Sequence, residues 1–194
     1  AASDVYKRQM LLGPLRHRFT ALERAKEQGI GHYFVPRYTR VVDTAESKDN
    51  INKAYNLIST SKVRNEMIID DVITCVARKQ TPVILTRFKE HAKFLHDALK
   101  EKADHVFLLY GDNSDKENAE IRVKLKQIPE NESLILVATG QKIGEGFDFP
   151  RLDVLMLAAP VSFEGRLEQY VGRLNRDYVG KEAVYVYDLS LIHI

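Results

Sequence analysis

Short apolar runs recur along the chain, and segments with a helical spacing of apolar residues separate most of them. The runs predict buried strands, because a strand covered on both faces is apolar without interruption. Strands are expected at Pro82–Thr86, His105–Tyr110, Ser133–Ala138, Val154–Ala158 and Ala183–Tyr187. Alternation of strands with helix-length segments predicts right-handed crossovers and an α/β fold, with helices on both faces of a parallel sheet.

The polar segments between these runs carry the signals of helices. Helices are predicted around Ile51–Ile58 and at Lys62–Arg78, Phe88–Lys100 and Ser114–Gln127. In the last of them, Ser114 and Glu117 have the spacing of a capping box. Residues 31–42 are rich in β-branched and aromatic types but contain Pro36, which favours an edge strand or an extended connector.

A further helix is predicted around residues 167–176, and its two faces differ in character. One face has the i, i+3, i+4, i+7 spacing of a buried stripe. This face comprises Leu167, Tyr170, Val171 and Leu174. The opposite face, rotated by about 200°, comprises Gln169, Gly172, Arg173 and Arg176. A mid-helix glycine costs about 1 kcal/mol relative to alanine, so Gly172 suggests the close approach of a backbone or a ligand.

A glycine-rich loop follows the strand at Ser133–Ala138 and contains Gly140, Gly144 and Gly146. The backbone amides of such a loop can face an anion. In open α/β sheets, ligands bind outside the carboxyl ends of the strands. Thr139 ends this strand, and its hydroxyl and the nearby amides are suited to bind a phosphate oxygen without reading base sequence.

Other polar residues follow the strand ends or lie in the same loop. Lys142 would add phosphate affinity, and Asp148 would accept a hydrogen bond from a ribose hydroxyl, with helix or turn capping as the alternative. Arg87 ends the first parallel strand on the ligand side of the sheet, although a solvated arginine before a helix is equally compatible. Gly111 ends the next strand, where a plain turn capped by Ser114 is the alternative.

These residues together resemble the motifs of superfamily 2 DExH-type helicases, and most closely the DNA helicases related to type III restriction subunits. The residues that resemble motif V are Thr139, Gly146 and Asp148. The residues that resemble motif VI are Gln169, Gly172, Arg173 and Arg176. Thr86 and Arg87 resemble motif IV. The resemblance extends from about residue 10 to residue 188.

The resemblance implies a RecA-like fold and the role of the second lobe of an ATP-dependent helicase or translocase. Arg173 and Arg176 would act catalytically, as arginine fingers on ATP bound to the first lobe. The nucleotide would also be contacted by Gln169, Gly146, Asp148 and Gly172. The nucleic acid, DNA or alternatively RNA, would be contacted by Thr139, Gly140, Lys142, Thr86, Arg87 and Gly111.

The sequence contains neither a Gly-x-x-x-x-Gly-Lys-Ser/Thr phosphate loop nor an Asp-Glu-x-His-like box. Phosphoryl transfer needs a phosphate cradle and Mg²⁺ in addition to an arginine finger. We therefore expect ATP and Mg²⁺ as cofactors, no metal ligand in this chain, the first lobe as a partner, and no ATPase activity from this chain alone.

Composition narrows the class of protein only modestly. A content of 44% hydrophobic and 29% charged residues is ordinary for a soluble domain, and a net charge of +2 is too small to indicate nucleic acid alone. The single cysteine, Cys75, excludes an internal disulfide, fits a cytoplasmic location and is expected in the core. No apolar run is long enough to cross a bilayer, so no membrane partner is expected.

The domain organisation follows from these assignments. Residues 1–9 and 190–194 match no neighbouring element and are expected to be non-native tails. Residues 10–48 are expected to connect from the first lobe, and residues 49–189 to form the second lobe. One alternative is a nucleic-acid-binding module without ATPase coupling. Another is a doubly wound nucleotide or flavin domain, which would carry its phosphate loop after the first strand, where residues 86–88 contain no glycine.

Overall fold

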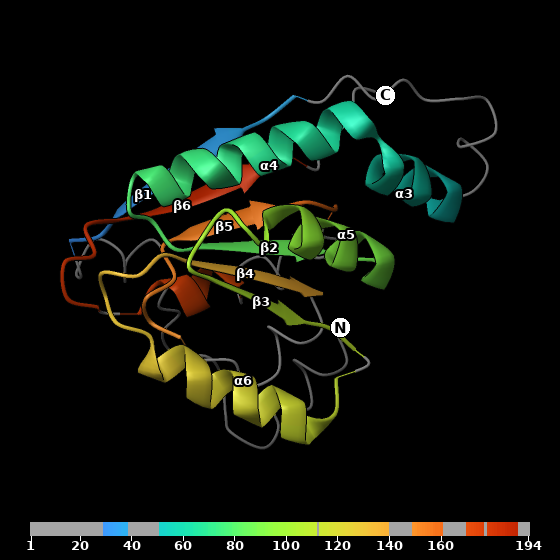
Figure 1. Ribbon diagram of the computed structural model, residues 1–194. Coiled ribbons are helices and arrows are strands. Elements are labelled where there is room, and N and C mark those ends of the chain that lie inside the picture. Colours follow the sequence, from blue (N-terminus) through green and yellow to red (C-terminus); the bar gives the residue numbers. More distant parts are fainter. Residues whose placement is uncertain are drawn as a thin grey trace, which may run out of the picture.

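The computed structural model describes residues 29–38, 51–111, 113–139, 149–160, 170–176 and 178–189. Within them, six strands form one sheet in the order β1-β6-β5-β2-β4-β3, and every neighbouring pair is parallel. The strands are β1 (Gly31–Pro36), β2 (Pro82–Thr86), β3 (His105–Leu109), β4 (Leu134–Thr139), β5 (Val154–Leu157) and β6 (Ala183–Asp188). The predicted parallel α/β sheet is confirmed (Figure 1).

The helices agree with the predicted segments to within one or two residues at their ends. They are α3 (Ile51–Thr60), α4 (Lys62–Ala77), α5 (Lys89–Leu99) and α6 (Asp115–Gln127), and residues 170–174 form a further helical segment. In α6 the predicted capping box is present. The Ser114 N–H donates to Glu117 Oε2 at 2.7 Å, and the Glu117 N–H donates to Ser114 Oγ at 3.2 Å.

The sheet separates two hydrophobic cores, because successive residues of a strand point to opposite faces. In β2, Ile84 belongs to the core beneath α4 and α5, which also contains the predicted Cys75. Val83 and Leu85 belong to the opposite core, which α6 and residues 170–174 cover. Figure 1 shows α3, α4 and α5 on one side of the strands and α6 on the other.

One buried arginine ties the helical layer to the sheet. Arg64 in α4 is 1% exposed, and its guanidinium donates to the carbonyl oxygens of Ala158 at 2.6 Å and Leu189 at 2.9 Å. These carbonyls lie directly after β5 and β6, and no strand residue in the described part of the chain pairs with them. Burial lowers the pKa of Arg64 to about 10, which leaves it charged at neutral pH. The N-terminal end of α4 is therefore anchored to the carboxyl ends of two strands.

The edge strand β1 lies within the segment that was expected to connect from a first lobe. It pairs with β6 over its whole length, from Gly31 opposite Ala183 to Pro36 opposite Asp188. The strand ends at Pro36, as expected for a residue without an N–H at a sheet edge. The sheet thus begins before residue 49, while the domain boundaries themselves remain a prediction. No helix among the described residues is long and apolar enough to span a membrane.

Candidate nucleotide and nucleic-acid sites

Four of the predicted site residues gather along the carboxyl ends of β2, β4 and the edge strand β3. Thr86 and Thr139 are register partners at the ends of β2 and β4. Arg87 directly follows Thr86, and Gly111 follows β3, which pairs with β4. This edge lies at the right of Figure 1, where the arrowheads of β2, β3 and β4 point.

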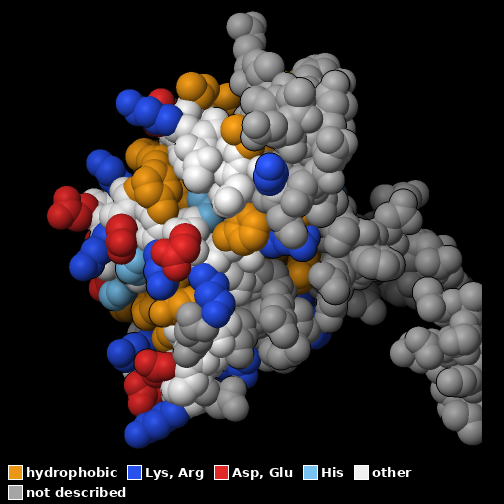
Figure 2. Space-filling model, turned by 90° about the vertical axis from the view of Figure 1, so that its right-hand side faces the viewer, with side chains coloured by type: hydrophobic (Ala, Val, Ile, Leu, Met, Phe, Trp, Pro, Cys, Tyr) orange, Lys and Arg blue, Asp and Glu red, His pale blue; other side chains and the backbone are white. Residues whose placement is uncertain are grey.

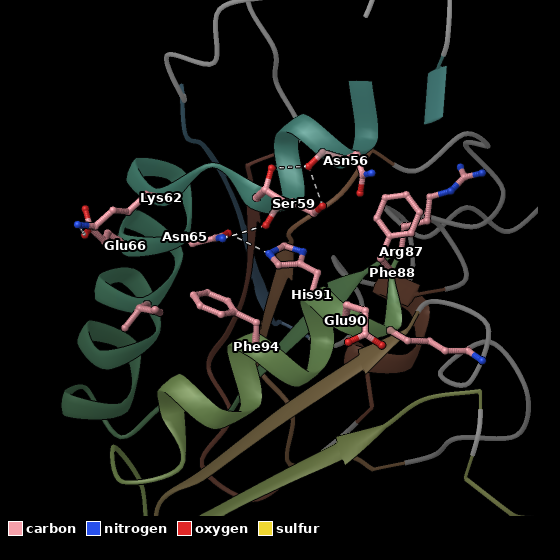
Figure 3. A pocket seen from close by; sticks show the side chains of 13 residues that line it. Asn56, Ser59, Lys62, Asn65, Glu66, Arg87, Phe88, Glu90, His91 and Phe94 are labelled. Carbon is pink, nitrogen blue, oxygen red and sulfur yellow. Dashed lines mark hydrogen bonds and ion pairs between the residues drawn. The ribbon is translucent and has the colours of Figure 1, made fainter. Parts of the chain in front are cut away.

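The Thr86 side chain is buried, with 3% of its surface exposed, and it belongs to a polar chain that connects four elements, β2, α5, α4 and α3. Its Oγ1 lies 2.7 Å from Nδ1 of His91, and His91 Nε2 lies 2.9 Å from Oδ1 of Asn65. Asn65 Nδ2 in turn donates to the carbonyl of Ser59 at 2.9 Å. Figure 3 shows Asn65 between His91 and Ser59, with both interactions drawn.

The direction of each hydrogen bond in this chain follows from Asn65. Because the amide nitrogen of Asn65 is used on Ser59, its oxygen must accept from His91 Nε2–H. The neutral His91 ring then carries a lone pair on Nδ1, so the Thr86 hydroxyl donates to it. Burial, followed by the charge of Arg64, lowers the pKa of His91 to about 4, which keeps the ring neutral at pH 7.

The prediction that Thr86 contacts nucleic acid through its side chain is therefore not supported, since its hydroxyl proton is committed to His91. The exposed group at this strand end is Arg87. Its guanidinium carbon lies 4.4 Å from the centre of the Tyr55 ring in α3, a cation–π arrangement that holds the side chain at the surface. Arg87 lines one end of a groove of about 970 Å³ between α3, α4 and α5 (Figure 3).

The neighbouring strand ends differ in their exposure. Gly111 is exposed, and a Cβ built there would lie 3.5 Å from Cε of Lys89, in ordinary contact. Thr139 is 7% exposed. Gly140, Lys142, Gly146 and Asp148 lie outside the described residues. Viewed from this edge, the described surface intersperses Lys and Arg with Asp and Glu side chains (Figure 2). Any binding of a nucleic-acid strand here would therefore depend on individual side chains more than on a net positive charge of the surface.

We call residues 170–176 the arginine segment, and their exposure agrees only in part with the two predicted faces, since Val171 and Arg173 are both half-buried. Tyr170 and Leu174 are buried in the core on the α6 side of the sheet, at 5% and 1% exposure. Arg173 is half-buried and Arg176 is exposed. The helix ends at Leu174, so Arg176 lies in the bend beyond the helix, whereas the sequence predicted that the helix would carry it. Gln169 lies outside the described residues.

The environment of Gly172 bears on the two explanations for a glycine there. A Cβ built on Gly172 would have no described atom within 4 Å outside its own turn of helix. The close approach of another backbone is therefore not what the described structure requires of this position. No described residue outside the helix explains the glycine at this position, and the approach of a ligand stays a prediction.

Arg176 lies at the opposite edge of the sheet from Arg87. The Arg176 carbonyl is 3.4 Å from Nζ of Lys181, which also contacts the carbonyls of Pro150 and Leu152. Those two residues precede β5, and Lys181 precedes β6, so the contacts lie at the amino ends of the strands. Among the described residues, Arg87 and the backbone of Arg176 therefore lie towards opposite ends of the strands. Lys181, His91 and Asn65 could not be identified from the sequence, because most of their partners are distant in sequence.

The described residues contain no cluster of three or more His, Cys, Asp or Glu side chains placed to hold a metal ion. The charged groups of residues 170–176 are instead the guanidinium groups of Arg173 and Arg176. Guanidinium groups match the oxygens of phosphates in charge and geometry. This segment therefore fits a polyphosphate ligand.

A parallel sheet covered by helices on both faces, with polar groups at its strand ends and an arginine segment packed beneath it, is the architecture of a RecA-like helicase lobe. The sequence comparison identifies the family. The chain belongs to the helicase conserved C-terminal domain family, which matches residues 63–177.

Solved structures share this fold. UvsW of T4 aligns with a TM-score of 0.56 at 23% identity, over 82% of this chain and 31% of that protein. The DNA-bound type ISP restriction-modification enzyme LlaBIII aligns with a TM-score of 0.63 at 17% identity, over 94% of this chain and 13% of the enzyme. Domain 2 of the DEAD-box helicase Mss116p, bound to an RNA duplex, aligns with a TM-score of 0.53 at 19% identity, over 83% of this chain and 55% of that one.

Curated relatives include transcript termination proteins of poxviruses. The A18 protein of Yaba-like disease virus is 28% identical over 172 residues, which cover 83% of this chain and 35% of the relative. The A18 protein of fowlpox virus is 30% identical over 117 residues, which cover 59% of this chain and 24% of the relative. The chain thus spans about a third or less of the length of these relatives.

Proposed function

We propose that this chain is the second lobe of an ATP-dependent superfamily 2 translocase of the DExH type, acting on DNA or alternatively RNA in the cytoplasm. Its partner is a first lobe in the same polypeptide, which holds ATP and Mg²⁺. Residues 49–189 form the lobe together with the edge strand β1. The proposal rests on the separation of two sets of groups in a helicase C-terminal domain. Arg87 and Gly111 lie at the carboxyl ends of the strands, and Arg173 and Arg176 lie towards their amino ends.

On the nucleotide side, ATP supplies the phosphoryl group that is transferred to water. Arg173 and Arg176 present guanidinium donors, and donors that are already in place stabilise the charge that develops on a transferring phosphoryl group. The buried Tyr170 and Leu174 hold the segment against the core. No described atom outside the helix lies within 4 Å of a Cβ placed on Gly172, and we expect an incoming phosphate to approach the helix there.

On the nucleic-acid side, the groups at the carboxyl ends of β2, β3 and β4 contact the sugar–phosphate backbone. Arg87 is the main cation of this set, since Tyr55 orients it and it is exposed. Contacts to phosphate carry no base identity. The protein should therefore bind strands of unrelated sequence with similar affinity, as a translocase that moves along a strand requires.

The test is strand-stimulated ATP turnover by the complete protein that contains this chain. Arg173→Ala and Arg176→Ala should each lower kcat by about 10³–10⁵-fold, the range measured for arginine fingers. Arg173→Lys and Arg176→Lys should not restore it, because an ammonium cannot reproduce the planar guanidinium fork. Arg122→Ala on the exposed face of α6 is the matched control and should keep the parental rate.

Two results would oppose the proposal. Parental kcat in both alanine variants would mean that the arginine segment is a solvated surface. Strand binding without any strand-stimulated turnover by the complete protein would favour the alternative, a nucleic-acid-binding module that is not coupled to ATP.

A further inference from the structure

Lys181 gathers backbone carbonyls from two separate segments around its ammonium group. Its Nζ lies 2.9 Å from the carbonyl oxygen of Pro150 and 2.6 Å from that of Leu152. It also donates to the carbonyl of Leu174, the last helical residue of the arginine segment, and lies 3.4 Å from the carbonyl of Arg176. The side chain thus connects the loop before β5 to the backbone on both sides of residue 175.

A tight turn places Lys181 in this position. The Lys181 N–H donates to the Tyr178 carbonyl at 3.1 Å, which closes a four-residue turn. Its third residue, Gly180, has φ of +79°, a conformation that glycine adopts without strain. A Cβ at Gly180 would meet no described atom within 4 Å, so the backbone angle and not lack of space calls for glycine. The turn directs the chain back beneath the end of the arginine segment.

The contacts satisfy a specific electrostatic need. The last carbonyls of a helix have no partner within it and carry the negative end of the helix dipole. An ammonium has three N–H donors and a full positive charge, so it forms charge-assisted bonds to these oxygens. Because the helix has ended before Arg176, the helical hydrogen-bond ladder does not fix the backbone of Arg176. Lys181 reaches the carbonyls of Leu174 and Arg176 and so restrains this bend.

We propose that Lys181 is a positioning residue for Arg176, which sets the place of its guanidinium through the backbone of residues 174–176. This inference rests on the proposed function. The arginine segment itself is held by other groups. Leu174 and Tyr170 are buried in the core, and the Asn175 N–H donates to the Val171 carbonyl at 3.0 Å. Loss of the ammonium should therefore release the bend that carries Arg176 and leave the helix in place.

The experiment measures ATP turnover by the complete protein at saturating nucleic acid. Lys181→Met keeps a linear side chain and removes the charge and the donors, and Lys181→Arg keeps both. Lys124→Met on the exposed face of α6 controls for the loss of one lysine. Arg176→Ala and the double variant of Lys181→Met with Arg176→Ala complete a thermodynamic cycle.

Lys181→Met should lower kcat by about 10–100-fold, the effect of misplacing a catalytic group by about 1 Å. The KM for ATP should stay within about threefold of the parental value. Lys181→Arg should recover a large part of kcat, and Lys124→Met should match the parent. In the Arg176→Ala background, Lys181→Met should have no further effect, because the group that it positions is gone.

The outcomes separate this inference from the proposed function. If Arg176→Ala turns over ATP at the parental rate, the proposed function fails. If Arg176→Ala is impaired while Lys181→Met keeps the parental kcat, or if the two effects multiply in the double variant, the positioning role fails alone. Should Lys181→Met not fold, Lys181→Gln gives the same cycle with a side chain that still donates. A fall in kcat that persists in the Arg176→Ala background would then show a general structural role and overturn the inference.

Discussion

The buried histidine in α5 makes the stability of the domain depend on pH. His91 accepts from Thr86 at Nδ1 and donates to Asn65 from Nε2–H, and the bond from Thr86 requires the neutral ring. Burial lowers its pKa from 6.5 to about 4, and the nearby charge of Arg64 adds to the effect. The folded state therefore excludes a proton that the unfolded chain accepts below about pH 6.5.

The sign and size of the effect follow from these two pKa values. Above pH 6.5 the ring is neutral in both states, and its contribution to the free energy of unfolding is fully present. As the pH falls from 6.5 to 4, only the unfolded state gains a proton, so the folded state loses stability. The difference between the two pKa values corresponds to a loss of about 3 kcal/mol by pH 4.

The assay is urea unfolding of the chain at pH 7, 5.5 and 4.5, compared with His91→Gln. Glutamine offers one acceptor and one donor without a titrating group in this range. The variant should be less stable than the parent at pH 7, and the gap should narrow as the pH falls. His96→Gln, on the same helix, is the control and should follow the parent. A parent and His91→Gln variant that lose stability equally between pH 7 and 4.5 would refute a buried neutral histidine.

Two further predictions concern the helix faces and the strand ends. Leu174→Ala should lower the free energy of unfolding by about 2–5 kcal/mol, because Leu174 is buried. Arg173→Ala should change the free energy of unfolding little. Thermal melts in which Arg173→Ala is destabilised and Leu174→Ala is not would contradict this assignment of the buried and exposed faces. Arg87→Ala should weaken binding to unrelated strands equally and lower the slope of log affinity against log salt by about 1, the loss of one phosphate contact. A loss of affinity that depends on base sequence, or an unchanged salt slope, would show that Arg87 does not contact the phosphates of the nucleic acid.

The strands of the sheet could be predicted because each one is recognisable from the residue types of its own short segment. The apolar residues Pro82 to Leu85 are followed directly by Thr86, and the structure has β2 with the predicted bounds, Pro82–Thr86. The capping box of Ser114 and Glu117 is equally local and is confirmed. The pairing of β1 with β6 could not be predicted, because it joins residues about 150 positions apart. The residue types of one strand do not identify a pairing partner so distant in sequence.

The sequence could predict which residues of the candidate site lie at the ends of strands, but not which of their side chains face solvent. Strand ends bring Thr86 and Thr139 together, as predicted. Whether a side chain at that edge faces solvent depends on distant packing, and His91 and Asn65 bury the Thr86 hydroxyl beneath α3 and α4. The spacing alone extends the helix to Arg176, whereas the structure ends it at Leu174, where Lys181 contacts carbonyls from two segments that are distant in sequence.

The central claim is that Arg87 and Arg176 serve different ligands on two separate surfaces. Strand-stimulated ATP turnover of the complete protein, titrated with nucleic acid, tests it in one measurement on three proteins. Arg176→Ala should lower the maximal rate by about 10³-fold or more and leave the half-saturating strand concentration near the parental value. Arg87→Ala should raise the half-saturating concentration and keep most of the maximal rate. If both variants change the same parameter, or if neither differs from the parent, the assignment of two surfaces to two ligands is wrong.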